Sequence, residues 1–243
     1  LIVDFSISNG ISKDSASQLT EYFLPDEITP SGENPMWRRT FGDNLNNVFT
    51  GKADYTHPFN DSTKLELGIQ SIFRTLDNDN SVLYYDQAMG IWQIDTSESN
   101  HFIFEEQVHS AYFNLSANRG RFGLSFGSRF EQAITTSAMA DENEEFENTY
   151  FSWFPTAALS YKISKQQEFQ LSYSKRINRP DFHSLNPYID YSNYPTIRGG
   201  NPYLDPEYIH SIEFGYAFYS KKLTLMPAIF YKRVNDVITR YRQ

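Results

Sequence analysis

The amino-acid sequence predicts an all-β protein: a partial, antiparallel, up-and-down transmembrane β-barrel of about nine strands. Two observations support this prediction. Stretches of about ten residues alternate apolar with polar side chains, a period that belongs to strands rather than helices. Short turns also alternate with long polar segments along the chain, as expected when one end of a barrel carries turns and the other carries loops.

The alternation defines where each strand should lie. It is clear from Gly120 to Glu131, where Phe122, Leu124 and Phe126 share one parity and small or polar residues take the other. We expect strands near residues 1–8, 46–57, 63–75, 101–115, 120–134, 149–163, 167–177, 207–219 and 223–233.

The connections distinguish a membrane barrel from a soluble sheet, which could show the same alternation. We expect short turns around 58–62, 117–119, 164–166 and 220–222, and long loops at 9–45, 76–100, 135–148 and 178–205. In an outer-membrane barrel the short turns face the periplasm and the long loops face outward. The odd strand number and open ends further suggest a piece of a larger barrel, because unpaired edges are not tolerated in hydrocarbon.

Composition agrees with this fold class. Aromatic residues are 16% of the chain, with 17 Tyr and 20 Phe, as expected where aromatic side chains line both membrane interfaces. A soluble, aromatic-rich β-sandwich is the alternative. The net charge of −9 argues against nucleic acid as a partner. The absence of cysteine excludes disulfides and thiolate sites.

The densest motif lies between the expected strands 167–177 and 207–219. Its prolines and its Gly199-Gly200 pair predict an extended, turn-rich path outside the sheet. We expect Arg176 and Arg179 to contact Glu207 or backbone carbonyls across the barrel wall and so to brace the loop. Contact with an anionic substrate is the alternative.

The runs YSKRINRP, LNPY and GNPYLDPEY (173–180, 185–188 and 200–208) resemble the C-terminal half of TonB-dependent outer-membrane receptors. The resemblance is to the outer-membrane β-barrel group common in Bacteroidetes. The residues that carry this motif, and that we expect to brace the loop, are Arg176, Arg179, Pro180, Asn186, Pro187, Gly200, Asn201, Pro202, Pro206 and Glu207.

The resemblance implies a barrel of about 22 strands around an N-terminal plug, which contacts TonB. It also implies transport of a siderophore, cobalamin, glycan or peptide. We find no plug-like segment, so residues 1–243 are expected to form part of one outer-membrane β-barrel domain. The expected partners are outer-membrane lipid, the remainder of the barrel and its plug, TonB through that plug, and a possible surface lipoprotein.

A second candidate site is the pair Arg129 and Glu131, which lie on the polar parity of their strand. We expect them to form a lumen-facing charge network, with ligand contact as the alternative. No Ser/His or carboxylate pair stands at catalytic spacing, and no His pair has metal-ligand spacing on a helix. We therefore expect no catalytic residues, no metal, no cofactor and no enzymatic activity.

The predicted function is the barrel segment of a TonB-dependent transporter in the bacterial outer membrane. Loops 76–100, 135–148 and 178–205 would recognise the substrate, since they are rich in Tyr, Asn and Asp. A non-transporting structural or adhesion barrel is the alternative. A soluble carbohydrate-binding β-domain is the third hypothesis.

Overall fold

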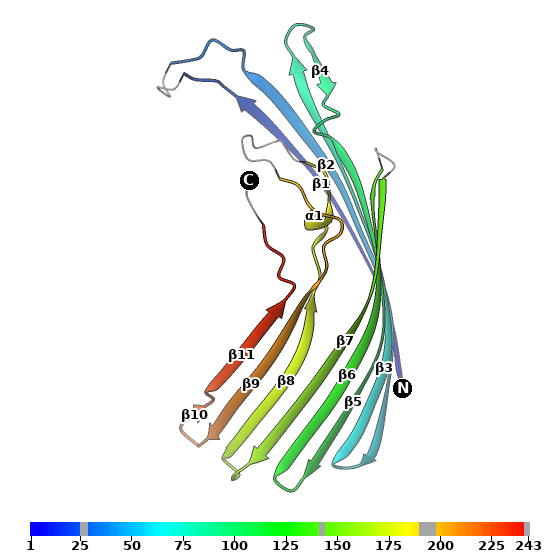
Figure 1. Ribbon diagram of the computed structural model, residues 1–243, viewed down its shortest axis with the longest axis vertical. Helices are drawn as coiled ribbons and strands as arrows, with labels where there is room; N and C mark the ends of the chain where they lie inside the picture. Colours follow the sequence, from blue (N-terminus) through cyan, green and yellow to red (C-terminus); the bar gives the residue numbers. More distant parts are fainter. Residues whose placement is uncertain (25–28, 141–143, 190–197, 241–243) are drawn as a thin grey trace.

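The computed structural model describes residues 1–24, 29–140, 144–189 and 198–240. The chain forms one antiparallel sheet that curves like a section of a barrel wall (Figure 1). The predicted all-β, up-and-down fold is therefore confirmed. In the part that the structure describes, no helix is long and apolar enough to cross a membrane.

The strands follow one another along the sheet in chain order. Each pairs with the next in the order β1-β2-β3-β5-β6-β7-β8-β9, and β10 and β11 both pair with β9. Their bounds are β1 Ile2–Thr20, β2 Met36–Asn60, β3 Thr63–Asp86, β4 Ile91–Ile94, β5 Asn100–Arg119, β6 Phe122–Met139, β7 Glu144–Lys162, β8 Gln167–Asn178, β9 Glu207–Tyr219, β10 Thr224–Leu225 and β11 Ala228–Asn235. The helix α1 spans Phe182–Leu185.

The nine expected strands correspond to this set with two differences. The expected strand 223–233 is interrupted at Pro227, so it appears as β10 and β11, although the Tyr216 N–H still donates to the Pro227 carbonyl at 3.0 Å. The short strand β4 was not expected. It pairs with the far end of β3, from Leu83 opposite Ile94 to Asp86 opposite Ile91.

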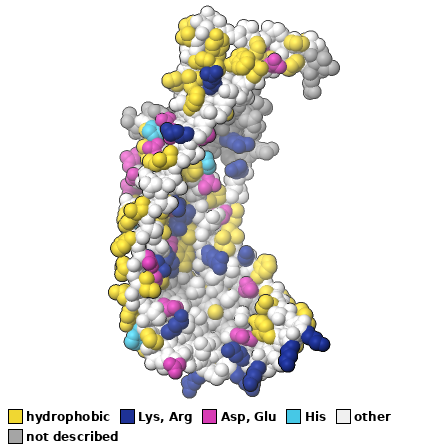
Figure 2. Space-filling model, turned by 180° about the vertical axis from the view of Figure 1, so that it is seen from behind, with side chains coloured by type: hydrophobic (Ala, Val, Ile, Leu, Met, Phe, Trp, Pro, Cys, Tyr) yellow, Lys and Arg dark blue, Asp and Glu magenta, His cyan; other side chains and the backbone are white. Residues whose placement is uncertain are grey.

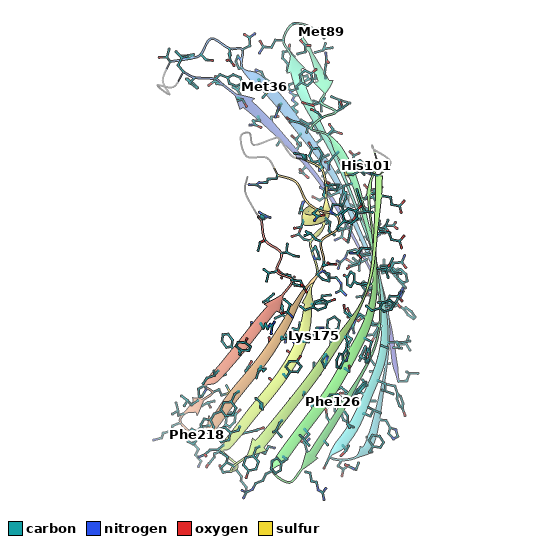
Figure 3. All side chains as sticks on the ribbon, in the orientation of Figure 1. Met36, Met89, His101, Phe126, Lys175 and Phe218 are labelled. Atoms are coloured by element: carbon teal, nitrogen blue, oxygen red, sulfur yellow. The ribbon has the colours of Figure 1, made fainter. Side chains whose placement is uncertain are left out.

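Three of the four expected long loops are wrong, because the strands continue through them. Strands β2 and β3 are 25 and 24 residues long, whereas roughly 9–11 residues suffice to cross a membrane. Most of 9–45, 76–100 and 135–148 is therefore strand, with 25–28 and 141–143 outside the described residues. The labelled residues Met36 and Met89 mark this overhang, far from the short turns (Figure 3). Only 178–205 is mainly loop, and its residues 190–197 lie outside the described part.

The two faces of the sheet differ in chemistry. The row Phe130, Ala111 and Ile69, in register across β6, β5 and β3, belongs to the outward, convex face. The adjacent row Glu131, Ser110 and Gln70 belongs to the concave face. Figure 2 shows hydrophobic side chains gathered along one edge of the wall and charged side chains over the hollowed surface. From Phe122 to Phe130, a strand tilted by about 40° rises about 20 Å, close to the height of a bilayer's apolar band.

Strands β7 and β8 pair over only part of their length. Their ladder runs from Lys162 opposite Glu168 to Thr156 opposite Ser174 and ends beside Pro155. Proline lacks the N–H that a ladder requires, so pairing on this side of β7 stops there. Beyond this point β8 leaves β7 and leads into the loop that carries α1.

The neighbouring alanines of β7 test the assignment of the two faces. Ala157 is exposed on the outward face opposite Phe126, whereas Ala158 is exposed on the concave face. We expect Ala157→Arg to lower the free energy of unfolding by about 2–4 kcal/mol, because it places a charge in hydrocarbon. Ala158→Arg should change it little. Urea unfolding in lipid vesicles measures both, and equal costs would contradict the assignment.

Candidate functional site: a charged network on the concave wall

Arg179 is the centre of a charged network on the concave face. Its Nη2 donates to Glu131 Oε2 at 2.5 Å, and its Nε donates to the Tyr150 hydroxyl at 2.9 Å. Arg129 holds the other oxygen of the same carboxylate, with Nε 2.5 Å from Glu131 Oε1. The Glu131 side chain is 8% exposed. A carboxylate so far removed from water requires paired cations, and two guanidinium groups supply them.

The network extends across four strands. Arg179 Nε lies 3.6 Å from Oε1 of Glu106 on β5, whose other oxygen is 3.2 Å from Arg74 Nη1 on β3. Arg129 on β6 also donates from Nη2 to Gln70 Oε1 at 2.9 Å. Tyr150 adds β7 to the set. The loop after β8 is therefore attached to the inner wall by a side chain that touches three strands.

The predicted lumen pair and the predicted loop brace thus belong to one cluster. Arg129, Glu131 and Arg179 come together, although β8 and β6 are not neighbours in the sheet. Sequence reasoning did not find Glu106, Arg74 or Tyr150. The sequence offered one sign of this site. Glu106 is a carboxylate that lies on the same face of β5 as the apolar Phe104 and Val108.

The expected contact between an arginine and Glu207 is wrong. Glu207 Oε2 accepts from Asn178 Nδ2 at 2.7 Å, and its Oε1 accepts from the Ile238 N–H at 2.7 Å. Arg179 instead turns toward the more buried Glu131. Arg176 is exposed on β8, and none of the ion pairs found among the described residues involves it.

The loop beyond Arg179 closes on itself through backbone contacts. The Gly200 N–H donates to the Asn186 carbonyl at 2.9 Å, and the Asn201 N–H donates to the Ser184 carbonyl at 2.8 Å. A Cβ at Gly200 would lie 2.5 Å from both of these carbonyl oxygens. Only glycine allows so close an approach of two backbone segments.

Asparagines order the turns at either side of this contact. Asn186 Oδ1 accepts from the Tyr188 N–H, and Asn201 Oδ1 accepts from the Tyr203 N–H, each at 3.0 Å. Such Asx turns fix the chain around Pro187 and Pro202, which supply no N–H of their own. Both prolines and Pro180 are half-buried, and Pro206 is buried where the chain enters β9.

Asp181 caps the single turn of α1. Its Oδ1 accepts the Ser184 backbone N–H at 2.8 Å. This hydrogen bond holds the pKa of the Asp181 carboxyl below its ordinary value of 3.8. The capping contribution is thus present at neutral pH and is lost only as pH falls below that value.

A small apolar cluster attaches the loop to the upper wall. Leu185 of α1 is buried with Phe102, Phe104 and Met139, which belong to the concave side of β5 and β6. The half-buried Leu76, Phe182, Tyr188 and Leu204 pack against it. Apolar residues on the otherwise polar face therefore mark where the loop docks, and the sequence analysis did not separate them from lipid-facing residues.

No group of three or more His, Asp or Glu side chains that could hold a metal ion occurs among the described residues. The cluster's chemistry is that of paired charges: guanidinium groups shared between carboxylates. It can position a loop and present charge to the barrel interior.

A curved antiparallel sheet with an apolar outward face and a charged concave face defines the class of outer-membrane β-barrels. The sequence profile of the Outer membrane protein beta-barrel family matches residues 1–243, so the chain belongs to that family. Its location is the bacterial outer membrane. No curated protein sequence matches it significantly.

The solved structures of two transporters are among those that share the fold. The ferric citrate transporter FecA matches with a TM-score of 0.57 at 12% identity, over 94% of this chain and 31% of that one. The copper transporter OprC matches with a TM-score of 0.59 at 14% identity, over 95% of this chain and 36% of that one. This chain therefore spans about a third of the length of either transporter.

Gly200 and Gly199 form a matched pair for testing the loop. We expect Gly200→Ala to open the contact with Ser184 and Asn186, because its Cβ would meet two carbonyl oxygens. At Gly199 the nearest atoms to an added Cβ are 3.7 Å away, an ordinary contact. Hydrogen exchange should rise across residues 182–189 and 198–204 in Gly200→Ala alone. A similar rise in both variants would refute the close-approach explanation.

Arg179 and Arg176 provide a second comparison. We expect Arg179→Leu to lower the free energy of unfolding by about 1.5–3 kcal/mol, the worth of a hydrogen bond to a buried charge. The remaining cations on Glu131 and Glu106 limit the loss. Arg176→Leu should stay within about 0.5 kcal/mol. A double-mutant cycle with Glu131→Gln isolates the pair, and a coupling energy near zero would show that the contact contributes nothing.

Proposed function

We propose that the chain is part of the wall of a TonB-dependent outer-membrane transporter, with its concave face toward a plug and a passing nutrient. The main support for this proposal is the kind of residue found on the concave face near the short turns. An open hollow of about 410 Å³ lies there, bordered by small side chains such as Ser116, Gly123, Ser125, Ala158 and Ser172.

Small hydroxyl and glycine residues leave space, and they offer hydrogen bonds without filling the interior. A barrel that closes on its own side chains would place bulky residues there. Glu168, Gln170 and Glu213 border the same hollow and supply charge and amide groups. This surface suits a folded, polar occupant, which we identify as the plug domain that the family resemblance implies.

Family membership and the folds of FecA and OprC support the transport role. They do not identify the nutrient. We assign substrate contact to the concave face beyond the membrane and to loop 178–205, since 76–100 and 135–148 are largely strand. A row of polar side chains crosses β1 to β3 on that face: Asn44 Nδ2 donates to Asp14, Asn78 donates to Asn44, and Asn80 donates to Asn78.

The test uses the full receptor with a photo-crosslinking residue at Ser172, and Leu171 on the opposite face as the control. We expect Ser172 to crosslink to a segment of the same polypeptide outside residues 1–243, whereas Leu171 contacts lipid. Mass spectrometry locates the link. Crosslinks at Ser172 to neither a plug nor any other folded segment would count against an occupied interior.

Energy coupling is measured separately in the same cells. Uptake from a panel of nutrients that includes ferric citrate and copper ions should disappear in a strain that lacks TonB. Uptake that continues unchanged in that strain would not affect the conclusion that the chain forms a barrel, but it would rule out TonB dependence.

A structural or adhesion barrel is the second candidate, and the overhang favours it. The ends of β1 to β3 far from the short turns, together with β4, extend well beyond the membrane and expose apolar side chains, including Trp37, Phe41 and Ile94. A surface lipoprotein or another cell surface could bind there. Attachment without TonB-dependent uptake of any nutrient would support this function over transport.

A further inference from the structure

The wall contains a seam between β7 and β8. The two strands pair near the short turns, but in the part of the chain that the structure describes no strand pairs with this edge of β7 over residues 144–155. Figure 1 shows the two strands separating beyond their ladder. The backbone groups along this edge therefore lack the partners that a barrel wall normally supplies.

Two backbone N–H groups of β7 point into the seam. Where the strand meets the next turn, the Ile163 N–H donates to the Gln167 carbonyl of β8 at 2.9 Å. Donor directions alternate along a paired strand, and β7 keeps one register with β6 throughout, so its odd-numbered residues direct their N–H groups toward β8. Pro155 has no N–H, so Trp153 and Phe151 carry the first donors beyond the ladder. Neither finds an acceptor in the turns and loops that the structure describes.

Lys175 of β8 is a half-buried cation at the same seam. Its Nζ lies 4.4 Å from the centre of the Tyr208 ring, and the Tyr208 hydroxyl lies 2.9 Å from Oγ of Ser152, which is buried on the concave face of β7. The ammonium group therefore lies beside the unpaired edge. Lys175 forms no ion pair with a carboxylate of the described residues, and the nearby Glu131 is already held by two arginines. A cation withdrawn from water favours an anion beside it.

An apolar groove on the outward face leads to this seam. Its volume is about 470 Å³, and it crosses four strands from Ile69 of β3 past Ala111 and Phe130 to Trp153 of β7. The small side chain of Ala111 leaves the hollow between its larger neighbours. With strands about 4.8 Å apart, the groove is about 14 Å long. Phe151 borders it at the seam and is 75% exposed.

The groove lies at the outer boundary of the apolar band. Phe130 ends the apolar run of β6, and Gln132 follows it on the same face. Ser71 and His109 border the groove at the same level as Gln132. Since the short turns face the periplasm, this boundary belongs to the outer leaflet. An acyl chain in the groove would contact apolar side chains, and its polar head would lie at the seam.

We propose that the seam binds the carboxylate of a long-chain fatty acid, whose acyl chain lies in the groove from Trp153 toward Ile69. The N–H groups of Phe151 and Trp153 donate to the carboxylate, and Lys175 supplies the opposite charge. Two donors and one cation suit a small head with a single negative charge, and one groove suits one chain. The inference rests on the outer-membrane location and is independent of the transport proposal.

The experiment measures palmitic acid bound to the full receptor in mild detergent by native mass spectrometry. We expect Lys175→Gln to weaken binding about tenfold, as expected for the loss of a hydrogen bond between charged groups. The matched control is Arg176→Gln, which removes the same charge from the next residue, on the opposite face of β8. The control should bind within about twofold of the unaltered receptor.

A second pair of variants tests the groove. We expect Ala111→Phe to fill the hollow and weaken binding about tenfold, as when two methylene groups lose their contacts. Ala157→Phe adds the same ring to the outward face of β7, outside the groove, and should leave binding unchanged. The heat-dependent shift of a folded barrel on electrophoresis verifies that each variant folds. The methyl ester of palmitic acid and phosphatidylglycerol serve as competing probes.

Four results would overturn the proposal. Equal binding of palmitic acid and its methyl ester would show that the carboxylate is not recognised. Equal weakening in Arg176→Gln would show a general charge effect. Unchanged binding in Ala111→Phe would place the acyl chain outside the groove. Preferential binding of phosphatidylglycerol would assign the site to a phospholipid with two chains.

Discussion

The need to satisfy every backbone hydrogen bond in hydrocarbon governs this structure. Consecutive strands meet it by pairing with their chain neighbours from β1 to β9. Pairing forces the side chains to alternate between a lipid-facing and an interior-facing surface, which is why Phe130 and Glu131 can be adjacent in one chain. Where pairing is released, as beside Pro155, the chain is free to leave the wall and form a loop.

The loop after β8 is held by two kinds of interaction that depend on each other. Arg179 joins buried carboxylates on separate strands, and the attraction between such charges is stronger where water is largely excluded. The apolar cluster around Leu185 and Phe102 provides part of that exclusion. Gly200 then lets the returning segment approach the helix closely enough for the cluster to close. The family motif is therefore a folding unit attached to the inner wall.

The sequence predicted the fold where the membrane imposes alternation, and it failed where the membrane ends. The segment from Phe122 to Phe130 contacts lipid on one face only, so its apolar and polar residues alternate without ambiguity. Asp77 to Asn80 has polar side chains on both faces, so its sequence is typical of a loop, although it is strand. In the site, the alternation of residues along the strand was enough to predict that Arg129 and Glu131 lie on the polar face. The partnership of Arg179 with Glu106 could not be predicted, because it depends on where a loop returns in space.

The order of strands also shapes how the chain assembles. Nearly every pairing joins neighbours in sequence, and local contacts of this kind let strands add one hairpin at a time. The β5–β6 and β7–β8 hairpins close over short turns, whereas β8 and β9 must find each other across the segment from Arg179 to Pro206. Closing that loop costs more entropy than closing a short turn, so we expect the β8–β9 pairing to form after the hairpins.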